Sequence, residues 1–148
     1  MTTIYGRKDS AVAISVVMLI SVAFLCGTVV GFPIAVNQRR LAAFSQSLQA
    51  YPIPPGARTV DSGALVVNLG NGNTCWYEAW VDIESTLTTS AMEAYYRGVE
   101  IPSIEGSWQN VVSIEVEALG SGSTPGSSLF RVKIWDHSEN ETFDLRCH

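Results

Sequence analysis

The clearest pattern in the chain is a long apolar stretch near its N-terminus. Residues 11–36 contain no charged side chain. A helix of that length extends roughly 39 Å at about 1.5 Å per residue, more than the roughly 30 Å of a bilayer's hydrocarbon core. The pattern predicts a short tail over residues 1–10 and a transmembrane helix over residues 11–36. Pro33 is expected to bend or end this helix near its far side.

A cleaved signal peptide is the alternative for this stretch. The apolar run is longer than the roughly 7–15 residues of a signal-peptide core, and no small-x-small cleavage site follows it. Leu25 stands directly before Cys26, where a lipoprotein site needs a small residue. We therefore interpret the segment as an uncleaved anchor.

Helical spacing continues beyond the apolar stretch. The recurring apolar positions are Leu41, Phe44, Leu48 and Tyr51. They predict an amphipathic stalk helix over residues 37–51. Residues 52–60 begin with three prolines in four positions, which favours a stiff, extended linker. We expect this linker to hold a domain of residues 61–148 off the membrane.

Within residues 61–148 apolar and polar positions mostly alternate with a period of two, which is typical of half-buried strands. The apolar rows are Cys75, Tyr77, Ala79, Val81 and Ile83; Val112, Ile114, Val116 and Ala118; Phe130, Val132 and Ile134; and Phe143, Leu145 and Cys147. On the opposite faces, Glu115 and Glu117 are expected to pair with Arg131 and Lys133 across strands.

One segment between these strands has helical spacing instead. Ser90 and Glu93 form a capping box, and Gly98 with Pro102 ends the helix that follows. The expected fold class is therefore α+β: a transmembrane helix and stalk, then a mostly antiparallel five-stranded sheet in the order ββαβββ, with one helix packed on one face.

The stretch LGNGNTCWYEAW contains the turn between the first two strands. A two-residue turn at residues 71–72 would pair Val67 with Trp76 and put the aliphatic row on the outer face. A three-residue loop over residues 71–73 would pair Val67 with Tyr77 and Leu65 with Ala79, which gathers the apolar residues on one face. The sequence favours the three-residue loop.

The charge of the chain excludes one class of partner. From Leu41 onward, five basic residues stand against thirteen acidic ones, a formal balance of −8. Such a surface repels the phosphate backbone, so we expect no nucleic-acid partner.

The cysteines bear on the compartment. Cys75 and Cys147 both occupy inward positions of their strands, which favours a disulfide between them; two buried free thiols are the alternative. A disulfide requires an oxidising compartment, so we expect a single-pass protein of the cell membrane. Its N-terminal tail would be cytoplasmic and its C-terminal domain extracytoplasmic.

Catalytic, cofactor and metal sites are not predicted. The glycines of residues 70–73 are followed by a strand instead of the helix that a phosphate-binding loop needs. Cys75 is expected to face the core, away from a base. Cys147 and His148 are adjacent and point to opposite faces of a strand, so they do not join Cys75 and His137 in a metal site. We expect a non-enzymatic protein without a cofactor.

Tryptophans suggest a binding surface. Trp76 and Trp80 lie on the outer face of one strand, and Leu65 with Val67 would join them under the two-residue turn. A large exposed apolar patch usually marks an interface. We predict an extracytoplasmic interaction or assembly module with a protein partner. The alternative is a ligand-sensing or glycan-binding domain that uses the surface around Trp76 and Trp80.

A resemblance adds to this reading. The proline-rich linker, GNGNTCWY and TTSAMEAYY together resemble a group of small bacterial single-pass membrane-anchored proteins of uncharacterised activity. The likeness covers residues 52–96. It implies a bacterial origin and the anchored architecture, and brings no site residue.

Overall fold

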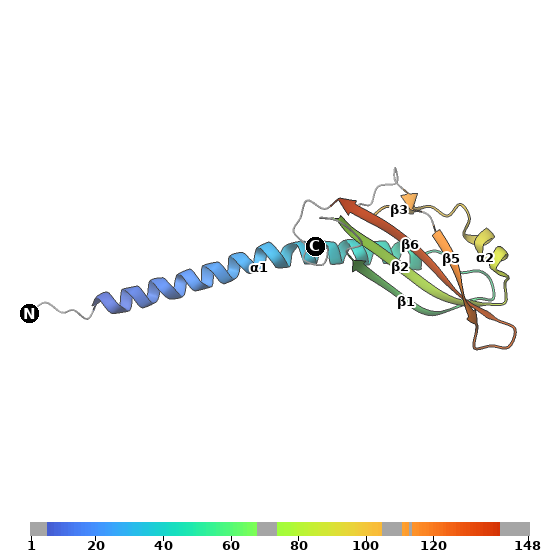
Figure 1. Cartoon of the computed structure of the whole chain (residues 1–148), viewed down its shortest axis with the longest axis horizontal. Helices are drawn as coiled ribbons and strands as arrows, with labels where there is room; N and C mark the ends of the chain where they lie inside the picture. The colour runs from blue at the N-terminus through green and yellow to red at the C-terminus, as the bar shows by residue number, and fades with distance from the viewer. Residues whose placement is uncertain (1–5, 68–73, 105–110, 113, 140–148) are drawn as a thin grey trace, which may run out of the picture.

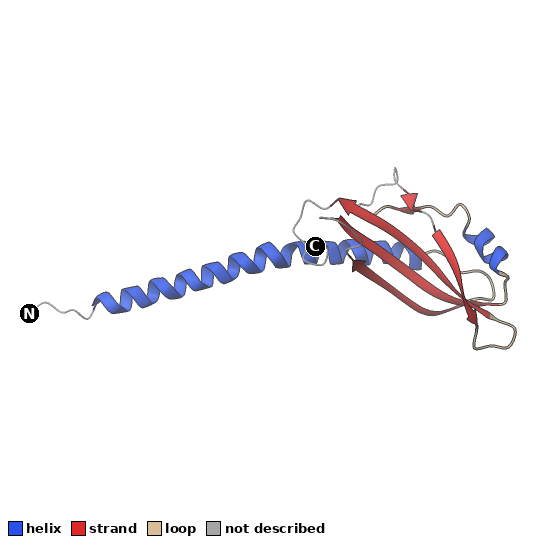
Figure 2. Ribbon diagram, viewed as in Figure 1, coloured by secondary structure: helices blue, strands red, loops and turns tan. Residues whose placement is uncertain are grey.

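The protein has α+β architecture. The computed structural model describes residues 6–67, 74–104, 111–112 and 114–139 (Figures 1 and 2). Its helices are α1 (Gly6–Gln49) and α2 (Thr89–Tyr96). Its strands are β1 (Arg58–Val67), β2 (Thr74–Ser85), β3 (Ile101–Pro102), β4 (Val111–Val112), β5 (Ile114–Ser121) and β6 (Ser128–Glu139).

Helix α1 runs without a break through Pro33 and joins the predicted span to the predicted stalk. Its N-terminal half extends away from the rest of the molecule (Figure 1). Side chains from Val12 to Phe32 are exposed, Val30 only partly so. This part of the helix is long and apolar enough to cross a membrane, a property that signal sequences share.

The C-terminal half of α1 belongs to the folded domain. The predicted apolar stripe is confirmed: Leu41, Phe44 and Leu48 are buried in the core cluster. They pack on the inward face of the sheet, behind β2 and β6 in Figure 1. The segment predicted as a stalk therefore packs on the domain's own sheet. An apolar stripe left in water would lose the burial that the sheet provides.

The sheet has four described strands in the order β1-β2-β6-β5, every neighbouring pair antiparallel. Strands β3 and β4 form a separate antiparallel pair. The predicted antiparallel sheet is thus confirmed for four strands. The fifth predicted strand, at Phe143, Leu145 and Cys147, lies outside the described residues. Strand β1 starts at Arg58, inside the segment predicted as linker.

The short helix α2 starts two residues earlier than the capping box predicted. Its N-cap is Thr88, whose hydroxyl accepts a hydrogen bond from the Ala91 backbone N–H at 3.3 Å. Ser90 lies inside the helix, so the predicted capping box between Ser90 and Glu93 does not form. Threonine is as suitable an N-cap as serine, and Thr88 takes that position. The apolar face of α2 consists of Met92 and Tyr96, which are buried in the core cluster.

The register of β1 on β2 corrects the expected turn. Val67 pairs with Trp76 and Leu65 with Glu78, which is the register of the two-residue turn. The turn itself lies outside the described residues. The reason is Gly63, which lies opposite Trp80: a Cβ at Gly63 would come within 2.3 Å of Trp80 Cζ2. The three-residue register would place Ala64 there, and its methyl group would collide with the indole.

The inward rows of the remaining strands are as predicted. Cys75, Tyr77, Ala79, Val81 and Ile83 of β2 and Phe130, Val132 and Ile134 of β6 form the centre of the core. Among the described elements, both helices pack on this inward face. The fold therefore separates an inward face covered by helices from an outer face that carries the predicted tryptophans.

Candidate interaction surface

The outer face of the sheet has an apolar end. We call Leu65, Val67, Trp76 and Trp135 the aromatic patch. Strand pairing brings them together: Val67, Trp76 and His137 lie in one row across β1, β2 and β6, and Leu65, Glu78 and Trp135 lie in the next. Three of the four predicted interface residues, Leu65, Val67 and Trp76, thus share one surface.

Two indole rings form the centre of the aromatic patch. The ring centroids of Trp76 and Trp135 lie 5.5 Å apart with an angle of 34° between planes, and Trp76 lies 5.2 Å from the His137 ring. Trp135 remains 49% exposed. Trp135 is not among the predicted interface residues; only the β2–β6 pairing brings it next to Trp76.

A shallow hollow of about 240 Å³ lies within the aromatic patch. It is lined by Val67, Trp76, Tyr77, Glu78 and Trp135. Aromatic rings supply apolar contact area at low entropic cost, and a carboxylate at the edge can accept hydrogen bonds. The hollow therefore suits a ligand with an apolar face and one or more hydrogen-bond donors that can reach Glu78.

Trp80 lies apart from this hollow. Its ring covers Gly63 on β1, and the Arg131 guanidinium lies 5.3 Å from its centroid on the other side. The side chain is half-buried. A guanidinium held over an indole face is a stabilising cation–π contact. Trp80 thus connects three strands of the outer face.

The opposite end of the outer face is charged. Arg131 binds Asp82 through two hydrogen bonds, Nε to Oδ1 at 2.8 Å and Nη2 to Oδ2 at 2.9 Å. The hydrogen bond to Asp82 raises the pKa of Arg131. Lys133 Nζ lies 3.3 Å from Glu115 and 3.7 Å from Glu117. The predicted cross-strand pairing is confirmed for Lys133, whereas Arg131 is oriented by Asp82.

Glu84 organises the loop between β5 and β6. Its carboxylate accepts hydrogen bonds from Ser127 Oγ and the Thr124 backbone N–H, both at 2.6 Å, and from Ser123 Oγ at 2.8 Å. Arg58 forms an ion pair with it. These bonds, led by the one from Ser127, hold the pKa of Glu84 well below its usual range. The loop between β5 and β6 is thus tied to β2.

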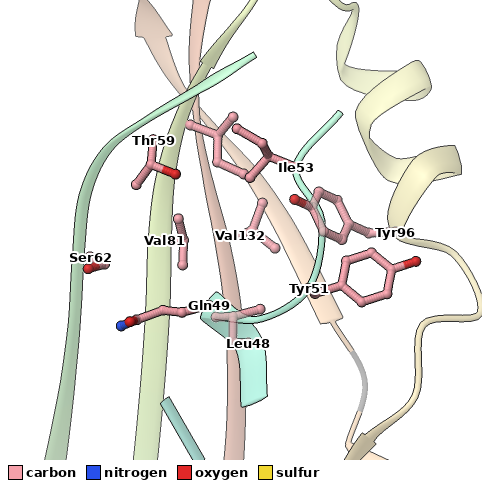
Figure 3. A pocket seen from close by; sticks show the side chains of 10 residues that line it. Leu48, Gln49, Tyr51, Ile53, Thr59, Ser62, Val81, Tyr96 and Val132 are labelled. Atoms are coloured by element: carbon pink, nitrogen blue, oxygen red, sulfur yellow. The ribbon is translucent and has the colours of Figure 1, made fainter. Parts of the chain in front are cut away.

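A second cavity lies on the inward side, between the end of α1 and the sheet. Its volume is about 250 Å³ (Figure 3). The lining is Leu48, Gln49, Tyr51, Ile53, Thr59, Ser62, Val81, Ile83, Tyr96 and Val132. Burial raises the pKa of Tyr96, so its phenol stays protonated. The cavity combines an apolar floor with a few neutral polar groups.

The start of β2 is attached to α1 through buried polar atoms. Cys75 and Asn37 are both completely buried, and Asn37 Nδ2 lies 3.7 Å from Cys75 Sγ. Cys147, the predicted disulfide partner, lies outside the described residues, as does His148. Among residues 6–67, 74–104, 111–112 and 114–139, no three His, Cys, Asp or Glu side chains gather as a metal site would require.

Comparison of the chain with models of protein families, with curated proteins and with solved structures yields no match.

Proposed function

We propose that this protein is a single-pass membrane-anchored, non-enzymatic interaction module that presents its outer sheet face to a protein partner. One observation carries the proposal: a single helix is exposed and apolar from Val12 to Phe32 and is packed into the domain core from Leu41 to Leu48. Such a helix joins the anchor directly to the domain, because α1 runs without a break from one half to the other.

The anchor is tested by placing charge in the exposed half of α1. Leu19→Arg with Phe24→Arg should move the protein from the membrane fraction to the soluble or degraded fraction, since an arginine at the centre of a membrane helix costs about 2.5–3.5 kcal/mol. Gln46→Arg, on an exposed position of the packed half, is the matched control and should stay with the membrane. Full retention of the double variant would contradict the anchor.

The domain is proposed to be extracytoplasmic, with a disulfide between Cys75 and Cys147. Two observations support this. Cys75 is fully buried on the inward face of β2, and of the described cysteines Cys26 is the free thiol. Mass analysis after alkylation without reductant should find Cys26 alone alkylated. Alkylation of all three cysteines after unfolding would contradict the disulfide and remove the main support for this orientation.

The interaction surface is tested by photo-crosslinking in living cells. A photoreactive phenylalanine analogue at Glu115 or Glu117, both exposed on the outer face, should give a discrete adduct with a protein. The control position is Glu93, which is exposed on α2. Adducts of equal yield at all three positions, or at none of them, would contradict a partner on the outer face.

A ligand-binding function is the second candidate, and the hollow beside Glu78 and the two stacked indoles favours it. Sugars with an apolar face bind on such rings while a carboxylate accepts their hydroxyls. Soluble cell-wall oligosaccharides should then change the tryptophan fluorescence of the wild type in a saturable manner, and leave Glu78→Gln less responsive. Absence of a saturable change with the wild type excludes this candidate for the sugars tested.

A further inference from the structure

The aromatic patch lies at the end of the sheet that is nearest to the exposed half of α1. The contact between Asn37 Nδ2 and Cys75 Sγ places the start of β2 level with Asn37 on the helix. Trp76 is the next residue, and its row across the sheet contains Val67 and His137. Strand β2 then continues toward the other end of the packed half of α1 (Figure 1).

The height of this row above a membrane follows from helix geometry. Residues 12–32 form a helix of roughly 32 Å, the thickness of a hydrocarbon core of about 30 Å. Asn37 lies five positions beyond Phe32, or roughly 8 Å along the axis. Each headgroup layer is about 5–8 Å thick, because the whole bilayer measures about 40–45 Å. The row that contains Trp76 therefore lies at the outer boundary of the headgroup layer. From there the indole ring of Trp76 can reach the lipid headgroups.

The side chains at this level are those that membrane interfaces favour. Tryptophan is enriched in the headgroup region, where its ring is partly apolar and its N–H meets water or phosphate. Trp76 and Trp135 supply two such rings. Arg39 and Arg40 follow within two turns of Pro33 and are exposed and half-exposed, respectively. Their charge complements lipid phosphates, and no spacer separates the domain from the exposed helix.

We propose that the aromatic patch is seated in the headgroup layer of the bilayer, so that the domain rests on the membrane at a second point beside its anchor. This inference rests on the anchor of the proposed function and names the occupant of one part of the outer face. The protein partner then meets the charged end, around Asp82, Arg131 and Glu117. A seated patch also sets the rotation of the domain about α1, because only one edge of the sheet can face the lipid.

The test uses the full-length protein in phosphatidylcholine vesicles that carry a spin label on the headgroup. Variant A retains only Trp76 and Trp135, through Trp80→Phe and Trp108→Phe. Variant B retains only Trp80, through Trp76→Phe, Trp108→Phe and Trp135→Phe. The fluorescence of variant A should fall roughly twofold or more, and that of variant B much less, because Trp80 lies four residues farther along β2 and is held between Gly63 and Arg131.

Two controls separate the possible failures. A variant with Phe24→Trp as its only tryptophan should be quenched by lipids brominated in the acyl chain; if it is not, the anchor itself has failed. Circular dichroism confirms that each variant is folded. If the anchor is intact, equal quenching of variants A and B overturns the proposal that the aromatic patch lies in the headgroup layer.

Quenching of variant A by aqueous acrylamide completes the test. Protection from acrylamide without quenching by the headgroup label means that a second copy of the chain covers the patch. That outcome overturns the contact between the aromatic patch and the headgroups, and it is consistent with a protein-binding surface at the patch. Free access of acrylamide together with no lipid quenching overturns the headgroup contact, because the patch is then exposed to water.

Discussion

Replacing Phe44 by alanine tests whether the C-terminal half of α1 is part of the domain. Phe44 is 3% exposed and belongs to the core cluster between helix and sheet. An aromatic side chain buries about 150–250 Å². At about 25 cal/mol per Å², this burial contributes roughly 4–6 kcal/mol as an upper bound. Measured losses for Phe→Ala in cores are about 3–5 kcal/mol, because the remaining methyl group and partial relaxation recover some of it.

The expected result is therefore a loss of about 3–5 kcal/mol in the free energy of unfolding, a large part of the roughly 5–15 kcal/mol of a small domain. With a urea m-value of about 2 kcal/mol/M, the midpoint falls by roughly 1.5–2.5 M. The assay is urea unfolding of the full-length protein in mild detergent, followed by tryptophan fluorescence.

The matched control for this experiment is Gln46→Ala on the exposed side of the same helix. An exposed substitution of this kind should change the free energy of unfolding by less than about 0.5 kcal/mol. If Phe44→Ala also stays within that limit, the helix does not pack on the sheet, and the stalk predicted from sequence is correct after all.

Three further predictions concern the sheet, the loop and the cysteines. Gly63→Ala forces a Cβ against Trp80 and should cost about 1–3 kcal/mol, as urea unfolding will show; in a Trp80→Leu background the same change should cost much less. Glu84 has a depressed pKa, so its ionised form stabilises the native state above its unfolded pKa of about 4.3, and this contribution is lost as the pH falls. The stability difference between wild type and Glu84→Gln should therefore shrink as the pH is lowered from about 6 through about 4, and a pH-independent difference would refute that role. If Cys75 and Cys147 form the proposed disulfide, Cys75→Ser and Cys147→Ser should each lower the free energy of unfolding by about 2–5 kcal/mol, and the double variant by no more than either, because both remove the same bond; additive costs would indicate two separate thiols.

Much of the fold was determined by the sequence pattern alone. The apolar run predicts the exposed half of α1, and helical spacing predicts that Leu41, Phe44 and Leu48 share one face. Period-two alternation predicts the inward rows of β2 and β6 correctly. These features depend on local periodicity, which each segment carries by itself whatever its neighbours are.

Tertiary structure decided what those faces touch. A stripe of apolar residues does not specify its partner, so the sequence could not distinguish a free stalk from a helix packed on its own sheet. In the same way, Asp82 and Glu84 have the pattern of solvated outer-face residues, yet Arg131 and the loop after β5 leave them 6% and 5% exposed. The burial of both carboxylates thus depends on residues that are distant from them in the sequence.

The aromatic patch depends on the same distinction. Residues 64–67 are all apolar, so either register of β1 on β2 buries two of them, and local pattern favours neither. The steric fit of Gly63 under the Trp80 ring selects one register, and the pairing of β2 with β6 adds Trp135 to Trp76. The sequence by itself determined which residues form strands and which faces alternate. Only contacts between strands decided which tryptophans meet, because register is a property of pairs of strands.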